Sequence, residues 1–99
     1  MPLRGLRNME ALEAIEDILQ AGRIDEAVGL LKEYIAASPV PSDRAYYLLG
    51  NAYRKRGDWQ GAINNYLEAM AINPDSPARN AYAIANEILD FFNKDMYNQ

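Results

Sequence analysis

The 99-residue chain contains neither cysteine nor histidine. Without cysteine there are no disulfides and no thiol nucleophile, and without either residue there is no zinc site built on sulfur or imidazole ligands. Histidine is also the side chain that most often transfers protons near neutral pH. No other residue combination resembles a nucleophile beside its base. We therefore expect a protein that is not an enzyme and that holds no cofactor and no metal.

A long apolar run is missing as well. Acidic residues interrupt every apolar stretch of "MEALEAIED", which follows the N-terminal "MPLRGLRN", so the sequence predicts neither a signal peptide nor a membrane span. The 14 acidic and 10 basic residues give a net charge of -4, whereas a general nucleic-acid binder needs a concentrated basic surface. We expect a soluble, cytoplasmic protein without nucleic-acid or membrane partners.

Two clusters of charged residues have alternative interpretations. The basic run 54–56 suggests nucleic-acid binding, but it falls at a predicted helix C-terminus, where basic side chains interact favourably with the helix dipole. A set of carboxylates spaced along one predicted helix suggests metal binding or acid–base chemistry, but we interpret it as a solvated face; it comprises Glu10, Glu13, Glu16 and Asp17.

An internal repeat is the most informative feature of the chain. Gly22, Ala27 and Pro39 recur 35 residues later as Gly57, Ala62 and Pro74, and the residues between them keep the same apolar phase at spacings of three to four. Each copy therefore reads as a helix, a tight turn and a second helix. The pattern predicts an all-α array of antiparallel helix hairpins with about five helices.

Local signals place the helix boundaries. Gly22 and Gly57 each stand between two helical runs, which suits a left-handed C-terminal cap. Asp58 can cap the helix that follows it, and Pro39 and Pro74 close the second helices. Asp75 or Ser76 can cap a fifth helix from about residue 77 to about residue 94.

The second copy resembles a tetratricopeptide repeat. The family pattern W-x2-L-G-x2-Y…A-x3-F…P matches at Tyr46, Leu49, Gly50, Tyr53, Ala62, Tyr66 and Pro74, with Gly57 at the turn and tyrosine in place of Trp and Phe. The first copy is degenerate, with Ala11, Ala14, Ile15 and Ile18 where the second has Tyr46, Leu49, Gly50 and Tyr53. We expect a loose leader (1–8), a degenerate first repeat (9–42), a second repeat (43–76) and a capping helix with a tail (77–99).

The resemblance implies a right-handed α-solenoid whose first helices line a concave groove that binds a peptide or a partner helix, and hence an adaptor or scaffold of unknown partner. The candidate groove residues, outward by helical phase, are Arg44, Tyr47, Asn51 and Lys55. The alternative is a solvated helix face with no ligand. The carboxylate grip that some family members use on chaperone tails is incomplete, because Leu12 and Glu16 stand at the matching positions of the first repeat.

Gly50 interrupts a predicted helix, where glycine costs roughly 1 kcal/mol relative to alanine. We interpret it as a point of close helix–helix contact with Ala62. A phosphate-binding role is disfavoured for Gly50 and Gly57, because the sequence lacks the glycine-rich phosphate motifs.

The last helix carries more apolar residues than one packing face requires. Ala81, Ala85, Ile88 and Phe92 form one stripe, which Ile84, Leu89 and Phe91 widen. The helix could cap the array within a monomer, which we favour, pair with a second chain in a homodimer, or dock on another subunit of a larger assembly. Self-association as a structural subunit is therefore the alternative function.

Overall fold

The computed structural model describes residues 8–97 and the side chains of residues 9–92. All regular structure in this part of the chain is helical, which confirms the all-α prediction. The five helices are α1 (Asn8–Gln20), α2 (Ile24–Ala37), α3 (Asp43–Lys55), α4 (Trp59–Ile72) and α5 (Ala78–Tyr97). Asn8, expected in the leader, is the first residue of α1; residues 1–7 of that leader lie outside the described part.

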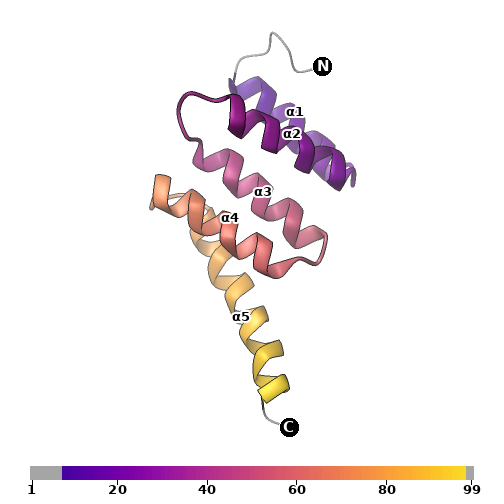
Figure 1. Cartoon of the computed structure of the whole chain (residues 1–99), viewed down its shortest axis with the longest axis vertical. Coiled ribbons are helices and arrows are strands. Elements are labelled where there is room, and N and C mark those ends of the chain that lie inside the picture. The colour runs from indigo at the N-terminus through magenta and orange to yellow at the C-terminus, as the bar shows by residue number, and fades with distance from the viewer. Residues whose placement is uncertain (1–7, 98–99) are drawn as a thin grey trace.

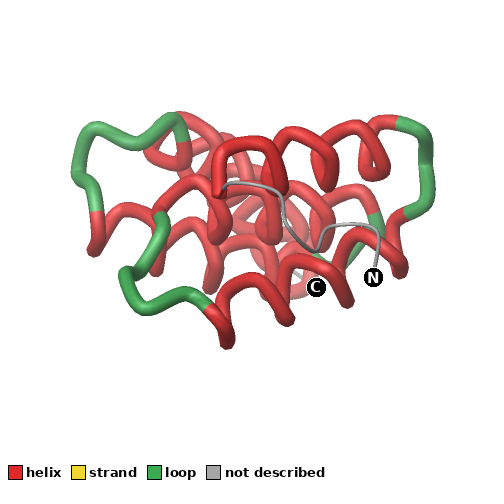
Figure 2. The backbone as a smooth tube through the Cα atoms, turned by 90° about the horizontal axis from the view of Figure 1, so that it is seen from above, coloured by secondary structure: helices red, strands yellow, loops and turns green. Residues whose placement is uncertain are grey.

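The helices form an elongated right-handed array that measures 54 × 27 × 18 Å. Each helix packs on its neighbour in the chain, and α1 also contacts α3. Figure 1 shows α1 and α2 at one end, α3 and α4 in the middle and α5 leaving the array beside α4. Seen from above, the connecting loops lie at both ends of the helices, as expected for antiparallel hairpins (Figure 2).

The turns use the residues that the sequence predicts. Gly22 and Gly57 have φ of +87° and +84°, a left-handed conformation that only glycine adopts without strain. The Asp58 carboxylate accepts a hydrogen bond of 2.9 Å from the backbone N–H of Gly61. Of the two candidate caps for α5, Ser76 is the one that caps the helix: its hydroxyl accepts a hydrogen bond of 3.1 Å from the backbone N–H of Ala78.

One hydrophobic cluster joins the first three helices. Ile15 of α1, Leu31 of α2 and Leu48 of α3 are its largest fully buried side chains. Leu31 stands where the second repeat has Tyr66, so the degenerate first copy closes its hairpin by burying aliphatic instead of aromatic surface.

A second hydrophobic cluster explains why a glycine lies inside α3. Tyr66 of α4 is completely buried, and its ring lies directly on Gly50. A Cβ atom at Gly50 would be 2.5 Å from two ring carbons of Tyr66 and 3.2 Å from the backbone oxygen of Ala62. The predicted close contact with Ala62 is therefore present, and the Tyr66 ring fills the space beside Gly50.

α5 covers α4 with only part of its length. Ala78 and Ala85 are fully buried, and Tyr82 and Leu89 pack against the same cluster. Phe92, predicted to belong to the packing stripe, is instead 55% exposed. Figure 1 shows the reason: α5 runs past α4, and its C-terminal half projects from the array.

Candidate functional site

A pocket of about 520 Å³ opens where several helices begin or end. It lies between the start of α1, the end of α2, the loop that follows α2, the start of α3 and the residue before α5. Its lining residues are Met9, Leu12, Tyr34, Val40, Pro41, Ser42, Asp43, Arg44, Tyr47 and Pro77. A volume of this size is ample for a large apolar side chain.

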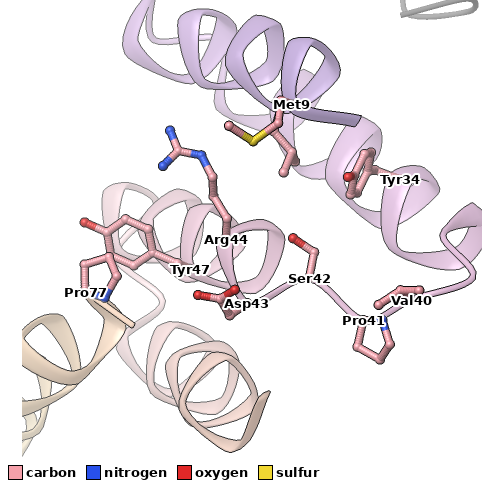
Figure 3. Close-up of a pocket in the computed structure, with 10 residues that line it drawn as sticks. Met9, Tyr34, Val40, Pro41, Ser42, Asp43, Arg44, Tyr47 and Pro77 are labelled. Carbon is pink, nitrogen blue, oxygen red and sulfur yellow. The ribbon is translucent and has the colours of Figure 1, made fainter. Parts of the chain in front are cut away.

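Arg44 and Tyr47, two of the four predicted groove residues, line this pocket. In Figure 3 the Arg44 side chain extends between Met9 of α1 and Tyr47. The Arg44 guanidinium pairs with the Glu16 carboxylate of α1. Glu16 is thus half-buried and has a partner, which corrects its assignment to a solvated acidic face. Because Glu16 neutralises Arg44, this end of the face offers little free positive charge.

Tyr47 provides a flat apolar wall. Its ring centroid lies 6.2 Å from that of Tyr66, and Pro77 lies beside it in Figure 3. Tyr47 is half-buried, because it lines the pocket and also packs against both hydrophobic clusters. Its place on the face agrees with the sequence prediction, but part of its surface serves the core.

Asn51 is held by a buried tyrosine. The Tyr66 hydroxyl donates a hydrogen bond of 2.6 Å to Oδ1 of Asn51. This bond occupies one of the two acceptor positions of Oδ1 and orients the amide, so that the Nδ2 group still offers two donors to another molecule. The sequence predicted an amide that pairs with peptide backbone, and the structure adds that its orientation is fixed by the core.

The electrostatics around Tyr66 bring in a residue that the sequence analysis did not place here. Burial raises the pKa of the Tyr66 phenol above its ordinary value of 10.0, and the nearby Arg54 guanidinium opposes that rise. Arg54 therefore lies close to the Tyr66 hydroxyl, which is hydrogen-bonded to Asn51. In the sequence, Arg54 stands seven residues after Tyr47 and three after Asn51, a spacing that predicts the same side of the helix for all three residues.

The basic run 54–56 does not form one patch. Arg56 turns toward the first repeat, where its guanidinium lies 2.7 Å from the Asp25 carboxylate and 5.3 Å from the ring centroid of Tyr53. Lys55 is exposed at the last residue of α3 and does not line the pocket. The four predicted residues thus fall into two pairs, Arg44 and Tyr47 at the pocket and Asn51 and Lys55 further along α3.

The loop after α2 supplies pocket residues that the sequence analysis missed. Val40 is 71% exposed between Pro39 and Pro41. An apolar residue between two prolines in a loop was the available signal, since prolines hold the backbone extended and keep such a residue at the surface. The packing of the helices brings Tyr34 and Pro77 to the pocket, and no local feature of the sequence predicts that they line it.

Among the residues that the structure describes, no group of three or more acidic side chains is placed to hold a metal ion. None of the described helices combines the length and the apolar character needed to cross a bilayer.

Comparisons with known proteins assign the chain to a family. A family model described as TPR repeat matches residues 50–82. The solved structure of the Bacteroides fragilis protein BF1650, determined by solution NMR, is 52% identical, with a TM-score of 0.78 over 89% of each chain. The chain belongs to the tetratricopeptide-repeat family. No curated protein matches it. Tetratricopeptide-repeat proteins mediate protein–protein interactions and are generally non-catalytic.

Proposed function

We propose that the protein is a non-catalytic adaptor that binds an acidic segment of a partner protein along the outward face of α3. This face, called the α3 face below, consists of Arg44, Tyr47, Asn51 and Lys55. The observation that carries the proposal is the fixed amide of Asn51: the Tyr66 hydroxyl donates to Oδ1 and orients the amide, whose Nδ2 group offers two donors. Arg54 and Lys55 near the end of α3 have donors and no acceptor.

A donor surface selects a ligand rich in acceptors. Backbone carbonyls satisfy the Asn51 amide, and carboxylates satisfy the cationic groups with stronger, charge-assisted hydrogen bonds. The other end of the face is different, because Arg44 is paired with Glu16 and the pocket beside Tyr47 is largely apolar. The two ends therefore suit two different ligand groups, a large apolar side chain and a carboxylate.

The helix geometry gives the spacing between these groups. Tyr47 and Lys55 are eight residues apart on α3, which corresponds to about 12 Å at a rise of 1.5 Å per residue. An extended peptide covers that distance in about three or four residues. The proposed ligand thus carries an acidic residue three or four positions from a large apolar one. A partner helix with the same two groups about two turns apart fits equally.

Self-association, the alternative function, would use a different surface. It draws its support from the exposed side of α5 and does not require the α3 face. The two functions are therefore separable by substitutions on one surface at a time.

Binding of short synthetic peptides with this spacing tests the proposal by calorimetry. Asn51→Asp keeps an oxygen acceptor for Tyr66 but replaces the two donors with a carboxylate, which repels an acidic ligand. We expect it to weaken binding by about 1 to 3 kcal/mol. Lys55→Ala should cost less than about 1 kcal/mol and have its largest effect at low salt.

Asn64→Asp is the matched control, because Asn64 is exposed on α4 outside the pocket and undergoes the same chemical change. Asn51→Ala is unsuitable, since it would leave the buried Tyr66 hydroxyl without its acceptor and destabilise the fold. A thermal melt of each variant separates lost binding from lost folding. Equal affinities for Asn51→Asp and Asn64→Asp would show that the α3 face is not the binding surface.

A further inference from the structure

α5 carries two apolar stripes, and α4 covers only one of them. The covered stripe, with steps of four, three and four residues, consists of Ala78, Tyr82, Ala85 and Leu89. The second, called the outer stripe below, consists of Ile84, Ile88 and Phe91, with steps of four and three residues. This alternation is the spacing of a helix that packs lengthwise on another helix. The apolar pattern of α5 is therefore typical of a helix that packs against two other helices.

The outer stripe is open to solvent over most of its area. Ile84 is 58% and Phe91 65% exposed, while Ile88 is half-buried. Next to it, Phe92 contacts Phe91 edge to face, with ring centroids 5.8 Å apart. Ile88, Phe91 and Phe92 also line a second depression together with Glu87. Three of the exposed large apolar side chains thus lie on one helix, which is unusual for a solvated surface.

Another copy could in principle cover this stripe head to tail, by placing its α1 there and extending the array. The outer side of α1 does not fit, because its exposed residues include Glu10, Glu13 and Asp17. The exposed side of α2 includes Asp25, Glu26 and Glu33. Neither helix offers an apolar stripe to match that of α5. The other exposed large apolar residues do not recur at steps of three or four along one helix; they are Met9, Val40, Leu67 and Ile72. The described surface that has the matching spacing is the outer stripe of a second α5.

We propose that the protein forms a two-fold dimer in which the outer stripes of two α5 helices pack antiparallel, with Ile88 near the axis. Ile84 of each chain then meets the region of Phe91 in its partner. Because α5 projects beyond α4 (Figure 1), this pairing places the two arrays at opposite ends of the joined helices. Antiparallel helices also align their dipoles favourably.

The buried area sets the strength of this dimer. A fully buried phenylalanine removes about 150 to 250 Å² from solvent, so two exposed phenylalanines and Ile84 in each chain contribute on the order of 600 Å² in all. This is below the range of stable protein–protein interfaces, even with flanking residues added. The dimer is therefore expected to be weak and to dissociate on dilution. It would present two α3 faces and bind a bivalent partner with increased avidity.

Sedimentation equilibrium of the full chain over micromolar concentrations tests the dimer. The mass should rise from one to two chains of 11.2 kDa. The double variant Ile84→Glu/Phe91→Glu should weaken the dimer about tenfold or more. Ala83→Glu/Asn86→Glu adds the same charge on exposed positions away from the outer stripe and should leave it intact. Melting curves of both variants confirm that each is folded.

The absence of native cysteine allows a test of orientation. Ile88→Cys should form an intermolecular disulfide readily under mild oxidation, whereas Asn80→Cys should not, because the antiparallel arrangement separates the two copies of residue 80. Equal cross-linking at both positions would contradict the antiparallel pairing. A monomer at all concentrations, larger aggregates, or a dimer that survives Ile84→Glu/Phe91→Glu would overturn the proposal.

Discussion

At the scale of single residues, Gly50 shows how a locally unfavourable choice is stabilised by packing. Glycine in a helix interior costs about 0.5 to 1 kcal/mol relative to alanine, yet a Cβ here would lie 2.5 Å from the Tyr66 ring. The ring is completely buried and cannot move away without disturbing Ala62 and its other neighbours. Overpacking of this kind costs more than the helix gains from alanine.

The same substitution at two glycines should therefore have opposite effects. Gly50→Ala should lower the free energy of unfolding by about 1 to 3 kcal/mol. Gly29→Ala, in the middle of α2, should raise it by about 0.5 to 1 kcal/mol, because no atom lies within 4 Å of an added Cβ there. Urea unfolding of both variants measures these changes. Stabilisation by both substitutions would contradict the close contact of α3 and α4.

At the scale of helices, the sequence predicts elements well wherever the signals are local. The glycine caps, the Asp58 cap and the apolar period depend on neighbouring residues, and the corresponding turns and helices are present. The packing of α5 depends instead on where α4 ends in space. For that reason the sequence placed Phe92 on the packing stripe, although it lies beyond the reach of α4.

α5 should be essential for the stability of the second repeat. Removal of residues 77–99 would expose Ile63, Tyr66 and Met70 of α4, which pack against α5 residues. The remaining buried area would not offset the loss of chain entropy, so the 1–76 fragment should unfold or aggregate. Circular dichroism during heating, with chain 1–92 as the control, measures this. A cooperative melt of the 1–76 fragment at the temperature of the full chain would show that α5 is an appendage.

At the scale of the whole molecule, the internal repeat predicts the family and the helical array, but it predicts the candidate site only in part. Helical phase places Arg44, Tyr47, Asn51 and Lys55 on one face because they belong to one helix. It does not show that Glu16, 28 residues away in sequence, neutralises Arg44. Nor does it show that Tyr66 orients Asn51, or that a proline-flanked loop builds the pocket. These are contacts between elements, and their geometry depends on how the hairpins stack.

The proposed function requires partner proteins to bind at the α3 face and its pocket. Photo-cross-linking in the native host can show this, with a photoreactive residue introduced at Val40, Lys55 or Asn64 in turn. Val40 is exposed at the pocket and Lys55 at the end of the face, whereas Asn64 is exposed on α4 outside it. We predict that the same partner is cross-linked from Val40 and Lys55 and not from Asn64. Cross-linking of that partner from Asn64 alone, or equally from all three positions, would show that the α3 face is not the binding surface.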